Sequence, residues 1–170
     1  MSNPFAFKAT YDSENSYLTL QYARQKDIDN FIFPNNNIDY LDIFGDYLDT
    51  LIIPDGVEHA CIDTLGLKHV YVPDSIKKLY CQDNFLETLD VPCTIENLVA
   101  NNNILQTLTF RGGPPNNLFM LELEGNRFQR FDFEIPKCCE VLNINKNYNV
   151  KYISPSIREF IDTSDEMYIP

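Results

Sequence analysis

The residues of this chain that could do chemistry are two histidines, five cysteines and a few closely spaced acidic side chains. His59 and His69 lie ten residues apart, and no CxxC motif, HExxH motif or phosphate-binding glycine loop accompanies them. The neighbouring thiols Cys138 and Cys139 could bind a soft metal or form a redox switch. Thiolate metal sites normally have three or four ligands, however. We therefore expect Cys139 to occupy a core position and Cys138 a loop.

Two other groups suggest chemistry only weakly. Cys61 is two residues from Asp63, whose negative charge would oppose formation of the reactive thiolate. Glu122 and Glu124 would point to the same face of a strand, because side chains alternate along a strand. General acid–base catalysis by this pair would need a pocket, and no motif predicts one. The sequence thus predicts a protein that is not an enzyme and uses no metal or cofactor.

Composition and charge restrict the partners. The chain has 170 residues, enough for one domain with a sizeable core, and 44% of them are apolar. Its formal charge of −12 argues against nucleic acids and anionic membrane surfaces, which attract Lys and Arg. The acidic excess has two interpretations that remain open, solubility and an acidic docking surface.

The location of the protein is predicted from its termini and its cysteines. The first residues, MSNPFAFKATYDSEN, do not form a signal peptide, and no run approaches the roughly 18 apolar residues of a membrane helix. Five cysteines at irregular spacings make a poor disulfide framework. We expect a reducing, cytoplasmic location, which for a viral chain would be the host cytoplasm or the virion.

A repeat of about 19–23 residues organises most of the chain. The stretch VPDSIKKLYCQDNFLETLDVP, residues 72–92, opens and closes on Val-Pro. Seven related segments recur at intervals of 20, 19, 19, 19, 23 and 22 residues, and they start at Ile28, Leu48, Leu67, Leu86, Leu105, Phe128 and Val150. Self-similarity at such a period is typical of a solenoid.

A second phrase follows each segment and carries a family resemblance. It reads apolar-x-x-apolar-x-apolar-x-x-Asn, as in IKKLYCQDN, IENLVANNN and CEVLNINKN, and a degraded seventh copy is IREFIDTS. LxxLxLxxN is the consensus of leucine-rich repeats, and residues 73–92 resemble the short repeats of secreted bacterial effectors, amoebae and large DNA viruses. Asp46 and Leu65 stand where this consensus has Asn. The resemblance covers about residues 28–163 and implies a right-handed solenoid with a concave parallel β-sheet, acting in recognition.

The alternation within each phrase predicts which side chains face the core. In residues 78–82, Leu79 and Cys81 would point inward, and Lys78, Tyr80 and Gln82 outward. The asparagines that end the phrases could bond to backbone groups of neighbouring turns and form a ladder. They could also be ordinary loop asparagines, since Asn occurs 18 times. Their common register favours the ladder, whose members would be Asn84, Asn103, Asn126 and Asn147.

The remaining segments complete the predicted architecture, an α/β-type solenoid dominated by β structure. The LxxLxVP segments end in Pro, which favours an extended or polyproline-like convex side. Residues 1–27 contain two aromatic-rich runs around the turn DSENS, which predicts an N-terminal β-hairpin cap. Residues 28–163 form about seven repeats, with an insertion at 111–117 that is either a binding loop or a tolerated surface insertion. The tail, residues 164–170, either folds back over the core or leaves its edge to a partner.

Outward positions of the concave sheet give the candidate binding residues. We expect a protein partner with a basic patch, held by aromatic anchors among carboxylates. An alternative function is a structural or assembly subunit that uses edges, insertion and termini. The predicted partner-binding residues are Tyr40, Asp42, Phe44, His59, Asp63, Lys78, Tyr80, Gln82, Val99, Asn101, Met120, Glu122 and Glu124.

Overall fold

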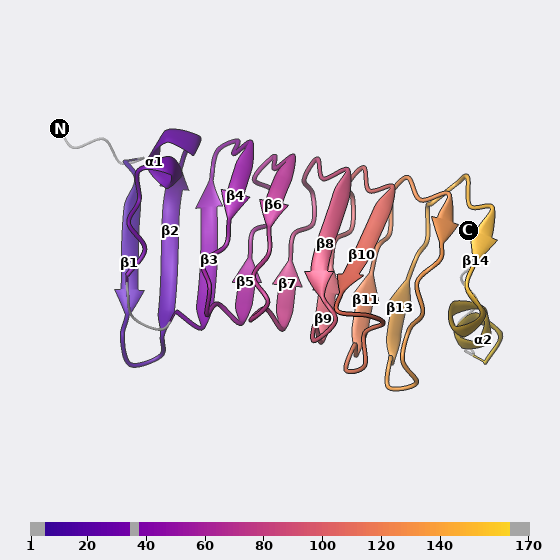
Figure 1. The fold of residues 1–170 in the computed structure, drawn as a ribbon. Coiled ribbons are helices and arrows are strands. Elements are labelled where there is room, and N and C mark those ends of the chain that lie inside the picture. Colours follow the sequence, from indigo (N-terminus) through magenta and orange to yellow (C-terminus); the bar gives the residue numbers. More distant parts are fainter. Residues whose placement is uncertain (1–5, 35–37, 164–170) are drawn as a thin grey trace.

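The chain forms a β-solenoid of about seven turns with one long sheet along its length (Figure 1). The computed structural model describes residues 6–34 and 38–163; the predicted C-terminal tail, residues 164–170, lies outside the described residues. The long sheet has the strand order β1-β2-β3-β5-β7-β9-β11-β13. Its strands are β1 (Lys8–Asp12), β2 (Tyr17–Ala23), β3 (Tyr40–Gly45), β5 (His59–Cys61), β7 (Lys78–Tyr80), β9 (Asn97–Val99), β11 (Met120–Glu122) and β13 (Val141–Asn143).

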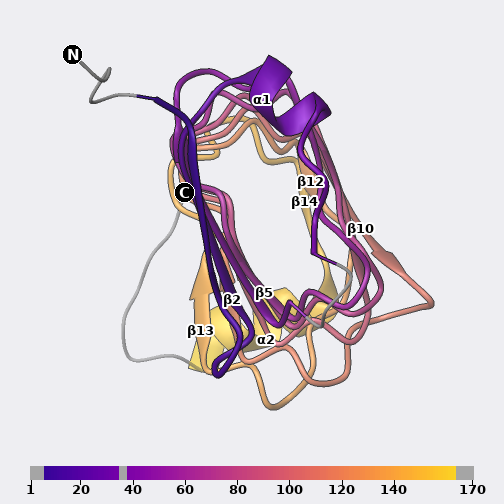
Figure 2. The ribbon, with the colours of Figure 1, turned by 90° about the vertical axis from the view of Figure 1, so that its left-hand side faces the viewer.

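The opposite wall of the solenoid is made of short strand pairs (Figure 2). These strands are β4 (Thr50–Ile52) with β6 (His69–Tyr71), β8 (Thr88–Pro92) with β10 (Thr107–Arg111), and β12 (Arg130–Phe131) with β14 (Tyr152–Ile153). All three pairs are parallel. The extended conformation that we predicted is therefore present, but the segments pair as strands rather than remain polyproline-like. Pro removes only one backbone donor near the end of each segment, so the preceding N–H groups remain free to pair.

The core is filled by the inward residues of both walls. Parallel register places Leu41 opposite Ala60, Ala60 opposite Leu79, and Leu79 opposite Leu98. These side chains have at most 1% of their surface exposed. Full burial of a leucine side chain contributes about 1.5–3 kcal/mol, so each turn gains stability only when its neighbours cover it. The predicted alternation and strand register are confirmed.

The corners after β5, β7, β9, β11 and β13 share one backbone conformation. One residue at this position adopts a left-handed conformation, with φ between +53° and +68°, in Thr64, Asp83, Asn102, Gly125 and Lys146. A β-carbon on Gly125 would lie 2.6 Å from Asn102 Oδ1, so glycine relieves a contact there as well as strain. The left-handed residue turns the chain away from the sheet and directs the next side chain into the interior.

That next side chain is the ladder asparagine in four turns. Asn84, Asn103, Asn126 and Asn147 are buried, and none has more than 6% of its surface exposed. Each Oδ1 accepts from a backbone N–H of the turn before, as Asn103 Oδ1 does from Leu86 N at 3.0 Å. Each Nδ2 donates to three carbonyls. The predicted asparagine ladder is confirmed.

The two ends of the solenoid differ from the repeats. At the N-terminal end, β1 and β2 form the predicted antiparallel hairpin, and β2 continues in parallel into β3. The first segment of the predicted repeat begins in a short helix, α1 (Gln25–Asp29), rather than in a strand. Its Ile28 is buried in the core.

The predicted seventh strand phrase at the C-terminal end is wrong. Residues 155–163 form the helix α2 (Pro155–Thr163), so Glu159, Ile161 and Thr163 do not continue the sheet. The apolar residues at 157, 160 and 161 recur at i, i+3 and i+4, which is helical spacing, and Pro155 suits the first turn of a helix. The third apolar position of the repeat phrase is occupied by Asp162. Ile157 is fully buried, with Phe160 and Ile161 partly buried against the core.

Candidate functional site

The candidate site is the outward face of the eight-stranded sheet, here called the main face. Strand register aligns its side chains in columns that run along the solenoid, as the sequence predicted. The first column is Tyr17, Tyr40, His59, Lys78, Asn97, Met120 and Val141. The second is Thr19, Asp42, Cys61, Tyr80, Val99, Glu122 and Asn143.

Strand β2 adds residues that sequence reasoning missed. Tyr17 and Thr19 extend the two columns, and Gln21 pairs with Phe44 to begin a third. The sequence pattern assigns the hairpin to a cap, and outward positions counted from the first strand phrase of the repeat do not include it. The alternation YLTLQ, with Leu18 and Leu20 buried, is the signal in the sequence that could have placed Tyr17 on the main face.

An aromatic stack lies at the N-terminal end of the first column. The rings of Tyr17 and Tyr40 are 5.7 Å apart and nearly parallel, and those of Tyr40 and His59 are 4.5 Å apart. The Tyr17 hydroxyl donates a hydrogen bond to Asp42, which raises the pKa of Tyr17 to about 12. Burial, together with the positive charge of Lys78, lowers the pKa of His59. His59 is therefore mainly a neutral stacked ring at neutral pH.

The exposed aromatic residues lie in the same half of the main face. Tyr40 has 41% and Phe44 has 52% of its surface exposed, whereas Tyr80 is half-buried. Val99 is only 7% exposed, so our expectation of an accessible apolar residue there is wrong. Its short side chain lies in register between Tyr80 and Glu122, whose longer side chains can cover it.

The third column continues from Phe44 through Asp63, Gln82, Asn101 and Glu124. Its polar side chains form a row of hydrogen bonds with one another and with the second column along the solenoid. Gln82 Nε2 donates to Asp63 Oδ2 at 3.2 Å, and the Gln82 backbone N–H donates to Asp63 Oδ1 at 2.9 Å. Burial raises the pKa of Asp63, although these hydrogen bonds oppose the shift. The carboxylate is thus held in place at a cost in desolvation.

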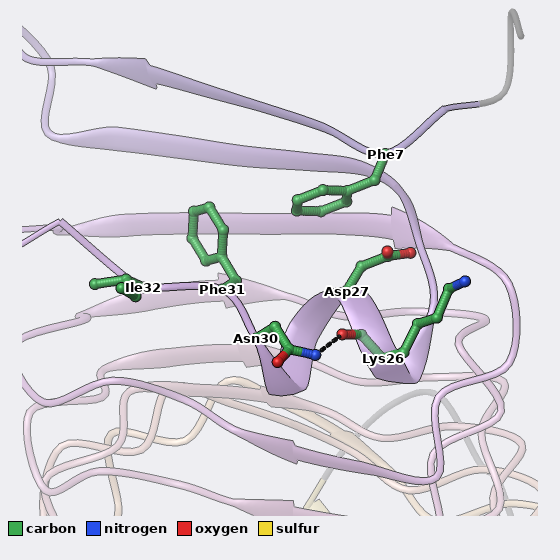
Figure 3. Close-up of a pocket in the computed structure, with 6 residues that line it drawn as sticks. All are labelled: Phe7, Lys26, Asp27, Asn30, Phe31 and Ile32. Atoms are coloured by element: carbon green, nitrogen blue, oxygen red, sulfur yellow. Dashed lines mark hydrogen bonds between the residues drawn. The ribbon is translucent and has the colours of Figure 1, made fainter.

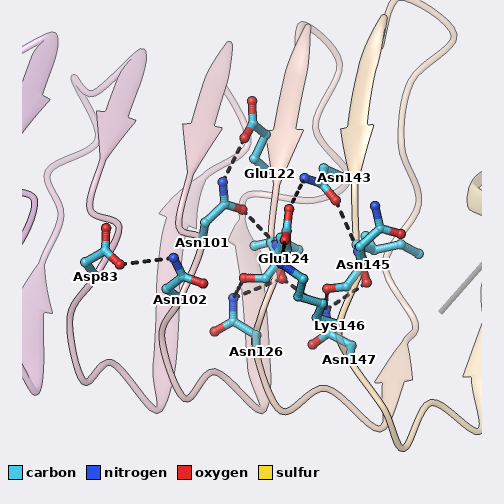
Figure 4. A network of polar contacts seen from close by, with 12 residues as sticks. Asp83, Asn101, Asn102, Glu122, Glu124, Asn126, Asn143, Asn145, Lys146 and Asn147 are labelled. Atoms are coloured by element: carbon cyan, nitrogen blue, oxygen red, sulfur yellow. Dashed lines mark hydrogen bonds and ion pairs between the residues drawn. The ribbon is translucent and has the colours of Figure 1, made fainter. Parts of the chain in front are cut away.

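The row continues across the C-terminal half of the main face (Figure 4). Asn101 Nδ2 donates to Glu122 at 2.8 Å, and Asn143 Nδ2 donates to Glu124 at 2.8 Å. Lys146 forms an ion pair with Glu124 at 2.5 Å, and this contact, with the bond from Asn143, lowers the pKa of Glu124. The carboxylates in this half already have intramolecular partners.

The groups that could have done chemistry lie apart or are covered. His59 is on β5 and His69 on β6, in different sheets. Burial and the nearby carboxylates of Asp63 and Asp42 raise the pKa of Cys61 to about 11, so its thiol stays protonated at neutral pH. Cys139 is buried, and Cys138 is exposed, as expected. Within residues 6–34 and 38–163, no group of three or more His, Cys, Asp or Glu side chains could hold a metal ion.

Comparison of the chain with protein-family models, with curated proteins and with solved structures gave no significant match. Neither of the helices that the structure describes is long and apolar enough to cross a membrane. The geometry of the main face is therefore the basis for a candidate function.

Proposed function

We propose that this protein is a non-enzymatic interaction module of the leucine-rich-repeat type, which binds a protein partner on its main face. The LxxLxLxxN phrases and the asparagine ladder support the repeat type. All five cysteines are free thiols, which supports a reducing, cytosol-like location.

One observation carries the binding proposal, the exposure of two aromatic side chains, Tyr40 and Phe44, beside a carboxylate on the main face. Tyr40 and Phe44 protrude from β3, and Asp42 lies between them on the same face. Exposed aromatic residues are the commonest anchors of protein interfaces, because they bury a large area at a small cost in side-chain entropy. The acidic surroundings favour a partner with a basic patch.

The hydrogen-bonded polar row gives the two halves of the main face different roles in binding a partner. Carboxylates that already bond to Asn143, Asn101 and Lys146 give little additional energy to a partner, since those contacts would have to be replaced. The tightest contacts are therefore expected around Tyr40, Phe44 and Tyr80. The C-terminal half contributes shape and a rim.

Two aromatic substitutions on opposite walls test the proposal. Phe44→Ala removes an anchor of the main face, and Tyr71→Ala removes an aromatic side chain of similar exposure, 62%, from β6 on the other wall. Pull-down with the unaltered chain identifies the partner, and surface-plasmon resonance then measures the kinetics. Phe44→Ala should weaken binding by more than about 1 kcal/mol through faster dissociation, and Tyr71→Ala should not. Loss of binding in Tyr71→Ala alone would move the site to the other wall.

A structural or assembly subunit is the second candidate function, and it is favoured by the outer edge of β1, which pairs with no strand within residues 6–34 and 38–163. In that case the insertion and the tail would matter more than the main face. Deleting residues 112–117 spares Arg111, which donates to Asp74 and to the Val72 carbonyl and so joins turns that are two repeats apart. Binding that is lost in this deletion, or on removal of residues 164–170, but kept in Phe44→Ala would favour the assembly function.

A further inference from the structure

The first strand of the long sheet, β1, is the terminal strand at its N-terminal end. β1 pairs with β2 on one side only, and no other strand among the described residues pairs with it. At the opposite end, α2 packs Ile157 into the core. An open edge presents backbone donors and acceptors to any strand that can align with it.

The sequence of β1 is complementary to itself in antiparallel register. Its residues KATYD place Lys8 and Asp12 two positions on either side of Thr10. Pairing with a second β1 centred on Thr10 would set each Lys8 opposite an Asp12 of the other copy. Lys8 and Asp12 align with Gln21 and Tyr17 of β2, so both side chains point outward on the main face. Opposite charges directly across two strands attract, and like charges there repel.

The inward side of β1 fits the same register. Ala9 and Tyr11 align with the buried residues Leu20 and Leu18, so they face the interior. Ala9 is nevertheless exposed, because β1 is the last strand of the sheet. In the register centred on Thr10, Ala9 of one copy would lie opposite Tyr11 of the other, a small residue beside a large one.

Apolar residues next to the open edge would be covered by the same contact (Figure 3). Phe7, directly before β1, packs edge-on against Phe31 with ring centroids 5.8 Å apart, and both line a pocket with Ile32. Ile32 has 88% of its surface exposed. A two-fold axis through Thr10 brings this end of one solenoid against the same end of another, so that the apolar residues of both copies lose solvent contact.

We propose that the chain forms a head-to-head dimer in which β1 pairs antiparallel with β1 of a second copy, in the register Lys8 to Asp12. The two long sheets then become one continuous sheet, and the two main faces lie on the same side of it. This inference does not depend on the proposed partner of the main face, because it uses only the N-terminal end.

Charge reversals that are complementary to each other test the register. Lys8→Glu sets like charges opposite in a homodimer, and so does Asp12→Lys, whereas a mixture of the two variants restores both attractive pairs. Sedimentation equilibrium should show the unaltered chain approaching twice its 19.7 kDa monomer mass as its concentration rises. Each variant alone should dimerise about tenfold more weakly, and the mixture should recover the original affinity. The measurements use about 0.15 M salt, which screens the repulsion between the two acidic chains.

Two controls keep the test decisive. Lys151→Glu makes the same change in net charge as Lys8→Glu, but at an exposed position near the other end of the solenoid, and it should leave dimerisation unchanged. Circular dichroism melts verify that each variant is folded, which matters for Asp12→Lys because Asp12 also accepts hydrogen bonds from Glu14 and Asn15 in the turn.

A disulfide trap reports the register without relying on charge. In a Cys138→Ser background, Thr10→Cys should cross-link under mild oxidation, because directly opposite residues of an antiparallel pair lie within disulfide range. Glu14→Cys, in the turn, should not. A monomeric mass for the unaltered chain at every concentration, or single charge variants that dimerise as well as the unaltered chain, would overturn the proposal.

Discussion

The asparagine ladder predicts a graded loss of stability that can be worked out bond by bond. Asn84 Oδ1 accepts from two backbone donors, Leu65 N at 3.1 Å and Leu67 N at 2.9 Å. Asn103 Oδ1 accepts from one, Leu86 N at 3.0 Å. Substitution by alanine leaves these buried N–H groups without an acceptor in the interior.

At Asn103, the carbonyls that accept hydrogen bonds from the side-chain amide add little to the expected loss of stability, because each of them has a second donor. The Cys81 and Ala100 carbonyls each accept from a second ladder amide, and the Asn101 carbonyl also accepts from Asp83 N. One orphaned buried donor costs about 1–3 kcal/mol, so Asn103→Ala should lose about that amount. Two orphaned donors double the estimate, and Asn84→Ala should lose about 2–6 kcal/mol.

Asn101→Ala is the matched control, because Asn101 lies two residues before Asn103 and faces outward on the main face. Its side chain bonds to Glu122 and to Glu124 N, but these contacts are only partly buried, and water can replace them. The expected loss is about 0.5–1.5 kcal/mol.

Urea unfolding followed by circular dichroism and by tyrosine fluorescence measures all three variants. Agreement of the two probes verifies that the solenoid unfolds as one unit, which repeat arrays do not always do. The expected order of losses is Asn84→Ala, then Asn103→Ala, then Asn101→Ala. If Asn84→Ala loses no more than Asn101→Ala, the ladder does not carry the stability assigned to it here.

The other predictions concern the register and the charge of the main face. Leu79→Ala should cost about 2–5 kcal/mol by opening a cavity, whereas Tyr80→Ala, which is half-buried on the outward face, should cost about 1 kcal/mol or less in the same urea assay. Asp63→Asn should stabilise the protein at neutral pH, because burial raises the pKa of Asp63 and the ionised carboxylate is therefore disfavoured in the folded state. The stability of the unaltered chain falls as the pH rises through this pKa, so the advantage of Asp63→Asn should be present at pH 7 and vanish in acid. If the melting temperatures of Asp63→Asn and the unaltered chain differ by the same amount at pH 7 and in acid, this linkage between the pKa of Asp63 and stability is excluded.

The repeat period made most of the fold predictable. Apolar residues at fixed offsets, such as Leu79 and Leu98, must stack because one turn cannot bury them alone, and that requirement fixed the register of β7 and β9 in advance. The buried asparagines were predictable for a similar reason, because a turn that leaves a sheet needs a polar side chain for its backbone groups. The error at residues 157–163 arose because Ile157 and Phe160 match the first two apolar positions of the repeat phrase. Asp162 occupies the third position, and the i, i+3, i+4 spacing of 157, 160 and 161 favours the helix.

The sequence by itself determined the solenoid, its inward and outward columns and its asparagine ladder, because these depend on periodic local patterns. Only the tertiary structure decided which outward residues are accessible. Val99 is covered and Phe44 is not, since exposure depends on neighbours from adjacent turns. The open edge of β1 was likewise a matter of tertiary pairing, because no pattern within residues 8–12 reveals whether another strand lies beside them.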